Sequence, residues 1–199
     1  PYFTEFAGNP SSVHGAGRTA RKGVDEARRQ VAGLVDPPES PPIFTRGGTE
    51  ANNMALMGIA ARANFKGHPL TSTVEHPSVL QMCDILQYRG VSVSRIGVDE
   101  QGVVDLDSLV DAITPETFLV SIMHANNETG VVQPVEKISE LCRSSDTLFH
   151  SDTVQSAAKL PLTLKGIGAD MISLSAHKFG GPKGIGALVV DNRLSLPGL

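Results

Sequence analysis

Apolar residues follow two alternating patterns along the chain, one typical of helices and one typical of buried strands. Residues 16–35 carry apolar side chains at helical spacing, and residues 49–64 are apolar on nearly every face, which predicts a buried helix. Short β-prone runs separate such segments. The predicted helices are residues 16–35, 49–64, 78–88, 107–113 and 135–143, and the predicted strands are residues 43–45, 70–74, 91–96, 118–123, 147–150, 171–175 and 185–190.

This alternation of strand and helix predicts an α/β fold with a mainly parallel central sheet and helices on both faces. The chain has 199 residues, enough for one well-packed domain and too few for two large ones. Ligands of such sheets collect at the carboxyl ends of the strands. The residues that follow each predicted strand are therefore the first candidates for chemistry.

The composition narrows the class of protein only slightly. Hydrophobic residues make up 40% and charged residues 19%, as in ordinary soluble globular proteins, and the net charge of −4 gives no reason to expect nucleic acid or an acidic membrane as a partner. No apolar run approaches the roughly 18 residues of a membrane span. Two cysteines make no disulfide framework, so a cytoplasmic location is expected. Because the chain opens with Pro1, a cleaved organellar leader stays an open alternative.

Lys178 is the first candidate because it lies just past the predicted strand 171–175 and before a glycine-rich stretch. In an extended segment, Ser175 and His177 point to one face and Lys178 to the other. A lysine at the end of a buried strand is costly unless it is paired, neutralised or used covalently, and a lysine amine forms a Schiff base with pyridoxal 5'-phosphate (PLP). The motif alone favours the alternative of an exposed loop lysine.

Asp152 is the second candidate because it follows the predicted strand 147–150. A carboxylate there can hold the protonated nitrogen of a pyridine ring. Gln155 would share a face with Asp152 if the chain turns helically, and from there could reach the phenolic oxygen of the ring. The alternative is that Asp152 caps the start of a helix.

Gly48 and Thr49 open a predicted helix directly after a strand, which makes a suitable phosphate cradle. Ordinary helix capping by Thr49 with Asn52 or Asn53 explains the pattern as well. The segment lacks the GK[ST] of a Walker loop and does not match GxGxxG, so sites for ATP and NAD are disfavoured.

His76 and Asn127 complete the set of polar residues that follow predicted strands. His76 could stack on a flat ring and move a proton, although a histidine before proline is often a turn residue. Asn127 could donate to a ring oxygen or belong to a tight loop. Each signal alone is weak, but together these clusters supply every contact that a PLP molecule needs, and no metal ligand set is predicted.

Six segments of the chain resemble the cysteine desulfurases of the NifS/IscS type, with selenocysteine lyase as close kin. The resemblance covers nearly the whole chain, in the family's order, and implies a class V aminotransferase-like PLP enzyme of fold type I. The segments are GNPSSVHGAGR at residues 8–18, GGTEANN at 47–53, EHPSV at 75–79, NNETG at 126–130, HSDTVQS at 150–156 and SAHKFGGPKGIGAL at 175–188.

The resemblance implies a role for each candidate. Lys178 and His76 would be catalytic, Lys178 as the Schiff-base lysine and His76 stacked over the ring. The implied cofactor-binding roles are Asp152 at the pyridine nitrogen, Gln155 and Asn127 near the phenolic oxygen, and Gly48, Thr49, Ser175 and His177 at the phosphate. In the implied reaction, a protein cysteine takes the sulfur of L-cysteine as a persulfide and alanine leaves.

The sequence also departs from the pattern of the family. Cys83 and Cys142 lie on apolar helical faces and are predicted to be core residues, so neither matches the cysteine that accepts sulfur. We therefore expect residues 1–199 to be a PLP-binding large domain that is incomplete at both ends, with a smaller C-terminal domain absent. A full-length enzyme is expected to be a homodimer that serves a sulfur-acceptor or scaffold protein.

Three interpretations remain open from the sequence. The first is a cysteine desulfurase of which this chain is the cofactor-binding core. The second is a selenocysteine lyase or another class V lyase on the same scaffold. The third is a catalytically inactive fragment that acts only as a binding or interaction module.

Overall fold

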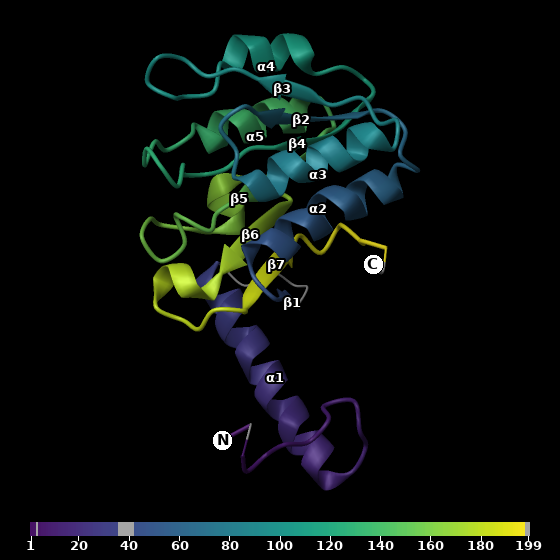
Figure 1. Ribbon diagram of the computed structural model, residues 1–199, viewed down its shortest axis with the longest axis vertical. Coiled ribbons are helices and arrows are strands. Elements are labelled where there is room, and N and C mark those ends of the chain that lie inside the picture. Colours follow the sequence, from purple (N-terminus) through teal and green to yellow (C-terminus); the bar gives the residue numbers. More distant parts are fainter. Residues whose placement is uncertain (3, 36–41, 198–199) are drawn as a thin grey trace.

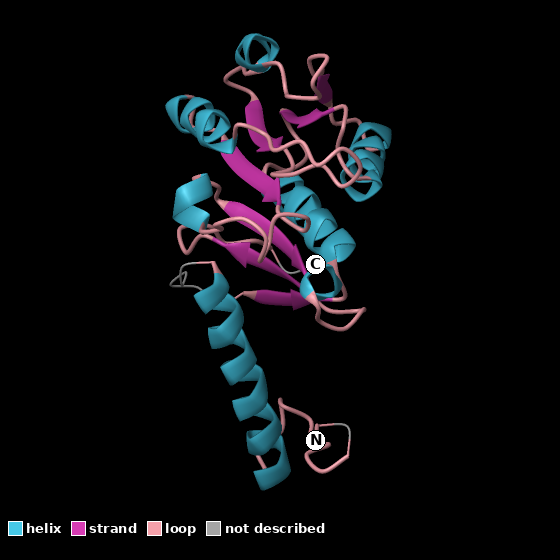
Figure 2. Ribbon diagram, turned by 90° about the vertical axis from the view of Figure 1, so that its left-hand side faces the viewer, coloured by secondary structure: helices cyan, strands magenta, loops and turns pink. Residues whose placement is uncertain are grey.

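The computed structural model describes residues 1–2, 4–35 and 42–197, and in it a seven-stranded sheet lies between helices. Figure 2 shows helices on both sides of the sheet, while one long helix extends away from its edge. The predicted α/β class is confirmed. Among the described residues, no helix combines the length and apolar character needed to cross a bilayer.

The elements follow one another in the alternating order that the sequence predicts. The helices are α1 (Gly15–Leu34), α2 (Gly48–Arg62), α3 (Pro77–Tyr88), α4 (Leu106–Ala112), α5 (Val135–Ser144) and α6 (Leu164–Ile167), with a short 3₁₀ helix, η1 (Ala176–Phe179). The strands are β1 (Ile43–Thr45), β2 (His68–Ser72), β3 (Ser94–Ile96), β4 (Thr117–Ser121), β5 (Leu148–Asp152), β6 (Met171–Ser175) and β7 (Gly186–Val190).

The sheet order is β1-β7-β6-β5-β4-β2-β3, and its centre is parallel. The pairs β2–β3, β2–β4, β4–β5 and β5–β6 are parallel, whereas β7 is antiparallel to both β6 and β1. The carboxyl ends of β2, β4, β5 and β6 therefore meet at one edge of the sheet. Because β1 runs antiparallel to β7, its carboxyl end faces the same edge.

Both faces of the sheet are buried, so neighbouring residues of a strand lie in the interior on either side of it. Neighbouring residues of one strand enter different core clusters: Leu119 packs with α2 and α3, while Val120 packs with residues that include Ile138 of α5. In the same way, Met171 packs in the cluster that contains Leu119, and Ile172 packs in the cluster that contains Val120. Figure 1 shows α2 and α3 side by side across one face of the sheet.

The structure differs from the predicted elements in a few places. The predicted strand 91–96 forms ladder pairs only at Ser94–Ile96, because Val91 packs instead into a small cluster with Leu86. The helix α6 was not predicted, since its four residues are too few to show a period. The chain after Ser175 is helical rather than extended, which changes the placement of Lys178.

Candidate active site

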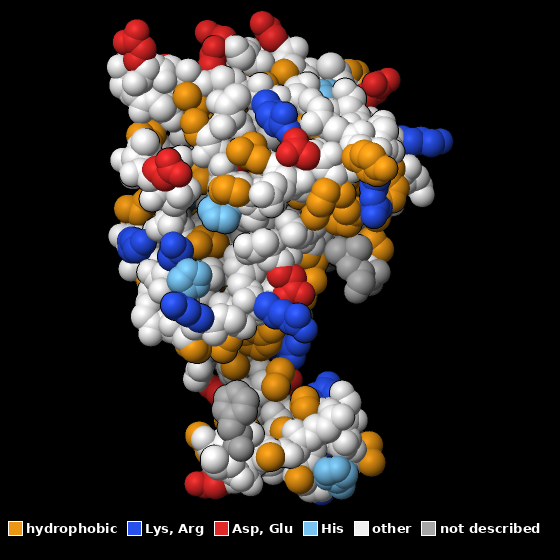
Figure 3. All heavy atoms as spheres, in the orientation of Figure 1, with side chains coloured by type: hydrophobic (Ala, Val, Ile, Leu, Met, Phe, Trp, Pro, Cys, Tyr) orange, Lys and Arg blue, Asp and Glu red, His pale blue; other side chains and the backbone are white. Residues whose placement is uncertain are grey.

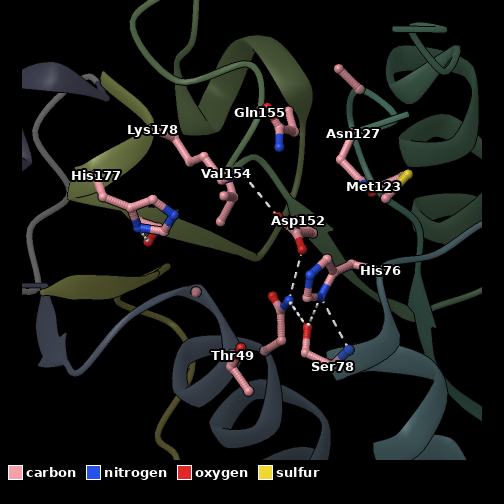
Figure 4. A pocket seen from close by; sticks show the side chains of 14 residues that line it. Thr49, His76, Ser78, Met123, Asn127, Asp152, Val154, Gln155, His177 and Lys178 are labelled. Atoms are coloured by element: carbon pink, nitrogen blue, oxygen red, sulfur yellow. Dashed lines mark hydrogen bonds between the residues drawn. The ribbon is translucent and has the colours of Figure 1, made fainter. Parts of the chain in front are cut away.

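One pocket, with a cavity volume of about 170 Å³, lies at the edge where the parallel strands end. Loops that follow β1, β2, β4, β5 and β6 all contribute to its lining, as Figure 4 shows. Every residue proposed from the sequence lines this pocket: Gly48, Thr49, His76, Asn127, Asp152, Gln155, Ser175, His177 and Lys178. The structure thus brings the predicted residues together, and their roles remain predictions.

The polar side chains differ sharply in depth. Asp152 is only 6% exposed and Ser175 only 1%, whereas His177 and Lys178 are exposed. A buried acid on the floor and an amine at the rim can hold two ends of one planar ligand. On the surface above η1 and the loop before β7, histidine and basic side chains gather (Figure 3).

The sequence-based placement of Lys178 was wrong in one respect. Lys178 was predicted at the end of an extended, buried strand, but β6 ends at Ser175 and Lys178 lies in the 3₁₀ helix η1, where its side chain is exposed. Gly180, which ends η1 with a φ of 89°, has the left-handed conformation that glycine adopts at little cost. The amine of Lys178 therefore reaches the pocket from the rim.

Asp152 has both carboxylate oxygens bonded. Its Oδ1 accepts from the Val154 backbone N–H at 2.9 Å, and its Oδ2 accepts from Asn52 Nδ2 at 2.7 Å. The alternative that Asp152 caps a helix is wrong, because the residues that follow it form turns and the next helix begins at Leu164. Burial raises the pKa of Asp152, and the hydrogen bonds from Val154 and Asn52 oppose that shift. A buried carboxylate in this position favours a cationic partner in the pocket.

His76 is both a helix cap and a pocket residue. It is the N-cap of α3, and its Nδ1 accepts from the Ser78 backbone N–H at 3.1 Å. Because Nδ1 is an acceptor in this bond, the neutral ring carries its proton on Nε2. The ring lines the pocket beside Asp152 (Figure 4).

The N-terminus of α2 forms the opposite end of the pocket from Asn127. The N-cap residue is Gly47, which has no side chain to bond the N–H groups of the first turn. The positive end of the helix is therefore left without a side-chain cap. Ser175 Oγ lies 3.0 Å from His177 Nδ1, and a Cβ added at Gly47 would lie 3.9 Å from that Oγ. These groups can all donate to an anion, as a phosphate requires.

Sequence reasoning missed five residues that line the pocket: Asn52, Ser78, Met123, Ala125 and Val154. Val154 fits closely, since a Cβ added at Gly48 would lie 2.6 Å from its Cγ2. Asn52 was considered only as a helix-capping residue, but its side chain points across to Asp152 instead. Its contact spans 100 residues of sequence, so no local pattern could predict it.

Glu75, next to His76, is a fully buried acid behind the pocket. Its Oε1 accepts from Ser72 Oγ at 2.6 Å and from the Met123 backbone N–H at 2.9 Å, whereas Oε2 is buried without a partner among the described residues. Burial raises the pKa of Glu75 to about 8, and the neighbouring charge of Asp152 adds to the shift. Glu75 is therefore largely protonated at neutral pH.

Glu75→Gln is expected to change how stability depends on pH. The folded protein holds an additional proton between the ordinary pKa of 4.5 and about 8, so the contribution of Glu75 to stability is lost as pH rises through this window. A glutamine keeps a neutral side chain at every pH. We expect E75Q to gain about 1.4 kcal/mol in free energy of unfolding over the wild type for each pH unit across the window.

Urea unfolding of both proteins at a series of pH values measures this difference. Glu116→Gln, at an exposed position, is the matched control and should show no such trend. Parallel stability curves for E75Q and the wild type would contradict the assignment of Glu75.

His150 and the two cysteines do not line the pocket, although His150 belongs to the same segment as Asp152. The ring of His150 bonds Ser121 Oγ at 2.8 Å and Ser173 Oγ at 2.9 Å, and burial lowers its pKa to about 3, so it is a neutral core residue. Cys83 and Cys142 are both buried, as predicted, and burial raises the pKa of each thiol to about 12.

Comparisons with known proteins identify the family to which this chain belongs. The family model described as aminotransferase class-V matches residues 1–196. The chain is 44% identical over 191 residues to "Cysteine desulfurase IscS" of Dictyoglomus turgidum, covering 96% of this chain and 48% of that protein. It is 47% identical over 192 residues to "Cysteine desulfurase" of Sinorhizobium fredii, covering 96% of this chain and 50% of the relative.

A solved structure has a similar fold. The structure titled "SspA in complex with cysteine" superposes with a TM-score of 0.94 at 40% identity, covering 100% of this chain and 58% of that one. The chain spans about half the length of the curated relatives that it matches.

Proposed function

Because this chain belongs to the aminotransferase class-V family, we propose that it is the cofactor-binding core of a PLP-dependent cysteine desulfurase. The observation that carries the proposal is one pocket that holds the amine of Lys178, the buried carboxylate of Asp152 and the ring of His76. Relatives named cysteine desulfurase and a similar structure in complex with cysteine support L-cysteine as the substrate.

The residues present fit PLP on three independent points. Asp152 is a buried carboxylate whose pKa is raised by burial, and a protonated ring nitrogen would relieve that cost. The first turn of α2 lacks a side-chain cap and faces Ser175, so it offers donors to a phosphate. Lys178 supplies an amine at the rim of the same pocket.

We assign the residues that would hold the cofactor accordingly. Lys178 would bind its aldehyde carbon, and Asp152 would bind its pyridine nitrogen. Gln155 and Asn127 would lie near its phenolic oxygen, and Gly48, Thr49, Ser175 and His177 would bind its phosphate. His76 would lie against its ring. When bound, PLP supplies an aromatic ring that accepts the electron pair released at the substrate carbon.

The chain's own side chains would position the substrate and move protons around that ring. Asp152 would hold a proton at the ring nitrogen, since its two hydrogen bonds keep the carboxylate as an acceptor. His76 carries its proton on Nε2 when neutral and can donate a hydrogen bond from that atom. Lys178, exposed and held on a short helix, would hold the cofactor and would supply an amine that can act as a base beside the substrate.

The sulfur acceptor is expected to be a residue other than the chain's two cysteines. A thiolate is needed to attack the sulfur of the substrate, but Cys83 and Cys142 are buried and have pKa values of about 12. A homodimer and a sulfur-acceptor or scaffold protein are part of the same proposal for the whole enzyme, in which this chain is the large domain.

Titration with PLP followed by addition of L-cysteine tests the proposal. We expect an absorbance band near the visible edge when PLP binds, and a change in that band when L-cysteine displaces Lys178. We expect no catalytic release of sulfide, because neither cysteine of the chain can serve as acceptor. Failure of the band to form would contradict the proposed cofactor, and sustained sulfide release would contradict the inference about the cysteines.

A further inference from the structure

Asn52 makes the contact with Asp152 that sequence reasoning missed, and its side chain is buried. It lies in α2 and is only 1% exposed. Its Nδ2 donates to Asp152 Oδ2 at 2.7 Å and to Ser78 Oγ at 2.9 Å, so the two amide protons reach two different elements of the fold. The ionised carboxylate can only accept, which fixes the orientation of the amide.

Ser78 continues the connection to His76. Its hydroxyl oxygen accepts from Asn52, so its own proton is free to point to His76 Nδ1, which lies 2.8 Å away. The backbone N–H of Ser78 donates to the same ring nitrogen. Asn52 and Ser78 are both nearly fully buried, and the chain of bonds runs from Asp152 through Asn52 and Ser78 to His76 (Figure 4).

The oxygen of Asn52 shows that stability alone does not account for this residue. Asn52 Oδ1 is buried and has no hydrogen-bond partner among the residues that the structure describes. An unpaired buried amide oxygen is unfavourable. A polar residue kept at that cost is better explained by what its two donors hold in place.

We propose that Asn52 and Ser78 are positioning residues that fix the Asp152 carboxylate and the His76 ring relative to each other. This inference rests on the proposed function, and it assigns these residues a role toward the pyridine end of the cofactor. Asn52 keeps Oδ2 of Asp152 an acceptor, while the Val154 backbone N–H does the same for Oδ1. Ser78 ties the same amide to the ring that lies beside the pocket.

The titration of Asp152 in the ligand-free protein tests the link without PLP. The titratable groups that interact with Asp152 are His76, Lys178 and Glu75. Asn52→Leu keeps a similar volume but removes both donors, so the midpoint of the Asp152 carboxyl carbon signal in an NMR titration should move to higher pH. Ser78→Ala should move it in the same direction by a smaller step, because the amide of Asn52 then loses one anchor.

Asn53→Leu is the matched control on the neighbouring position of α2. The amide of Asn53, in the orientation that satisfies both of its atoms, donates to the carbonyls of Thr49 and Ser78 rather than to Asp152. The Asp152 midpoint should be unchanged in N53L. A purely structural role for Asn52 would lower thermal stability in N52L and leave the Asp152 midpoint where it is in the wild type.

PLP affinity provides the second measurement. Loss of a hydrogen bond to a buried carboxylate should weaken PLP binding roughly 10- to 100-fold in N52L, and less in S78A. The two substitutions should be non-additive in the double variant, because they break one connection. If N52L does not fold, S78A carries the test, and an unshifted Asp152 midpoint there overturns the proposal. A shifted midpoint together with no PLP binding in the wild type would overturn the proposed function but leave the link intact.

Discussion

Lys178→Ala is expected to abolish the covalent attachment of PLP, with complete loss of the absorbance band that forms when PLP binds the wild type. Lys178 is the lysine that lines the pocket in which Asp152 and His76 also lie. The phosphate-binding groups at α2, Ser175 and His177 remain in the variant, so PLP can still bind weakly and without a covalent bond. Absorbance titration and retention of PLP after gel filtration measure the two effects separately.

Lys183→Ala is the matched control for this prediction. Lys183 follows Lys178 by five residues, is exposed, and does not line the pocket. K183A should keep the band and its PLP affinity. If K178A retains a band of wild-type strength, the amine that holds the cofactor is elsewhere in the protein.

Asp152→Asn is expected to weaken PLP binding by about 2–5 kcal/mol, or roughly 30- to 5000-fold in Kd. The substitution keeps the shape of the side chain but removes its charge, and the single remaining oxygen can accept from Val154 N–H or from Asn52, not from both. A protonated pyridine nitrogen would then lose its buried anionic partner. The bound PLP should also lose the spectrum of the protonated ring.

Asp170→Asn is the control for the loss of a buried carboxylate in general. Asp170 is partly buried, its pKa is also raised by burial, and its Oδ2 accepts from the Phe149 backbone N–H at 2.9 Å. It does not line the candidate active site. Equal loss of PLP affinity in D170N and D152N would show that the effect comes from general destabilisation rather than from contact with the ring.

Much of the fold could be predicted because the sequence patterns of helices and of buried strands are both local. Helices with an apolar face and strands buried on both faces leave distinct patterns in the sequence, and the ends of α2, α5 and β6 were predicted to within two residues. The position of a polar residue just past a strand then predicts its place at the edge of the sheet. This rule alone brought His76, Asn127 and Asp152 to one pocket.

The remainder depends on contacts that no local pattern contains. The side chain of Asn52 could not be assigned to Asp152 because 100 residues separate them and because helix capping explained the asparagine as well. The 3₁₀ turn at Lys178 was missed because four residues show no period, and an extended chain was the simpler expectation after a strand. The buried acid Glu75 became visible only with the packing around it.

The most direct test of the account is the identity of the residue that binds PLP. The protein is incubated with PLP, reduced with borohydride to make the bond permanent, digested, and analysed by mass spectrometry. The account predicts that the label lies on the peptide that contains Lys178, and that competition by L-cysteine before reduction removes it. A label found mainly on another lysine, or spread evenly over the exposed lysines, would contradict it.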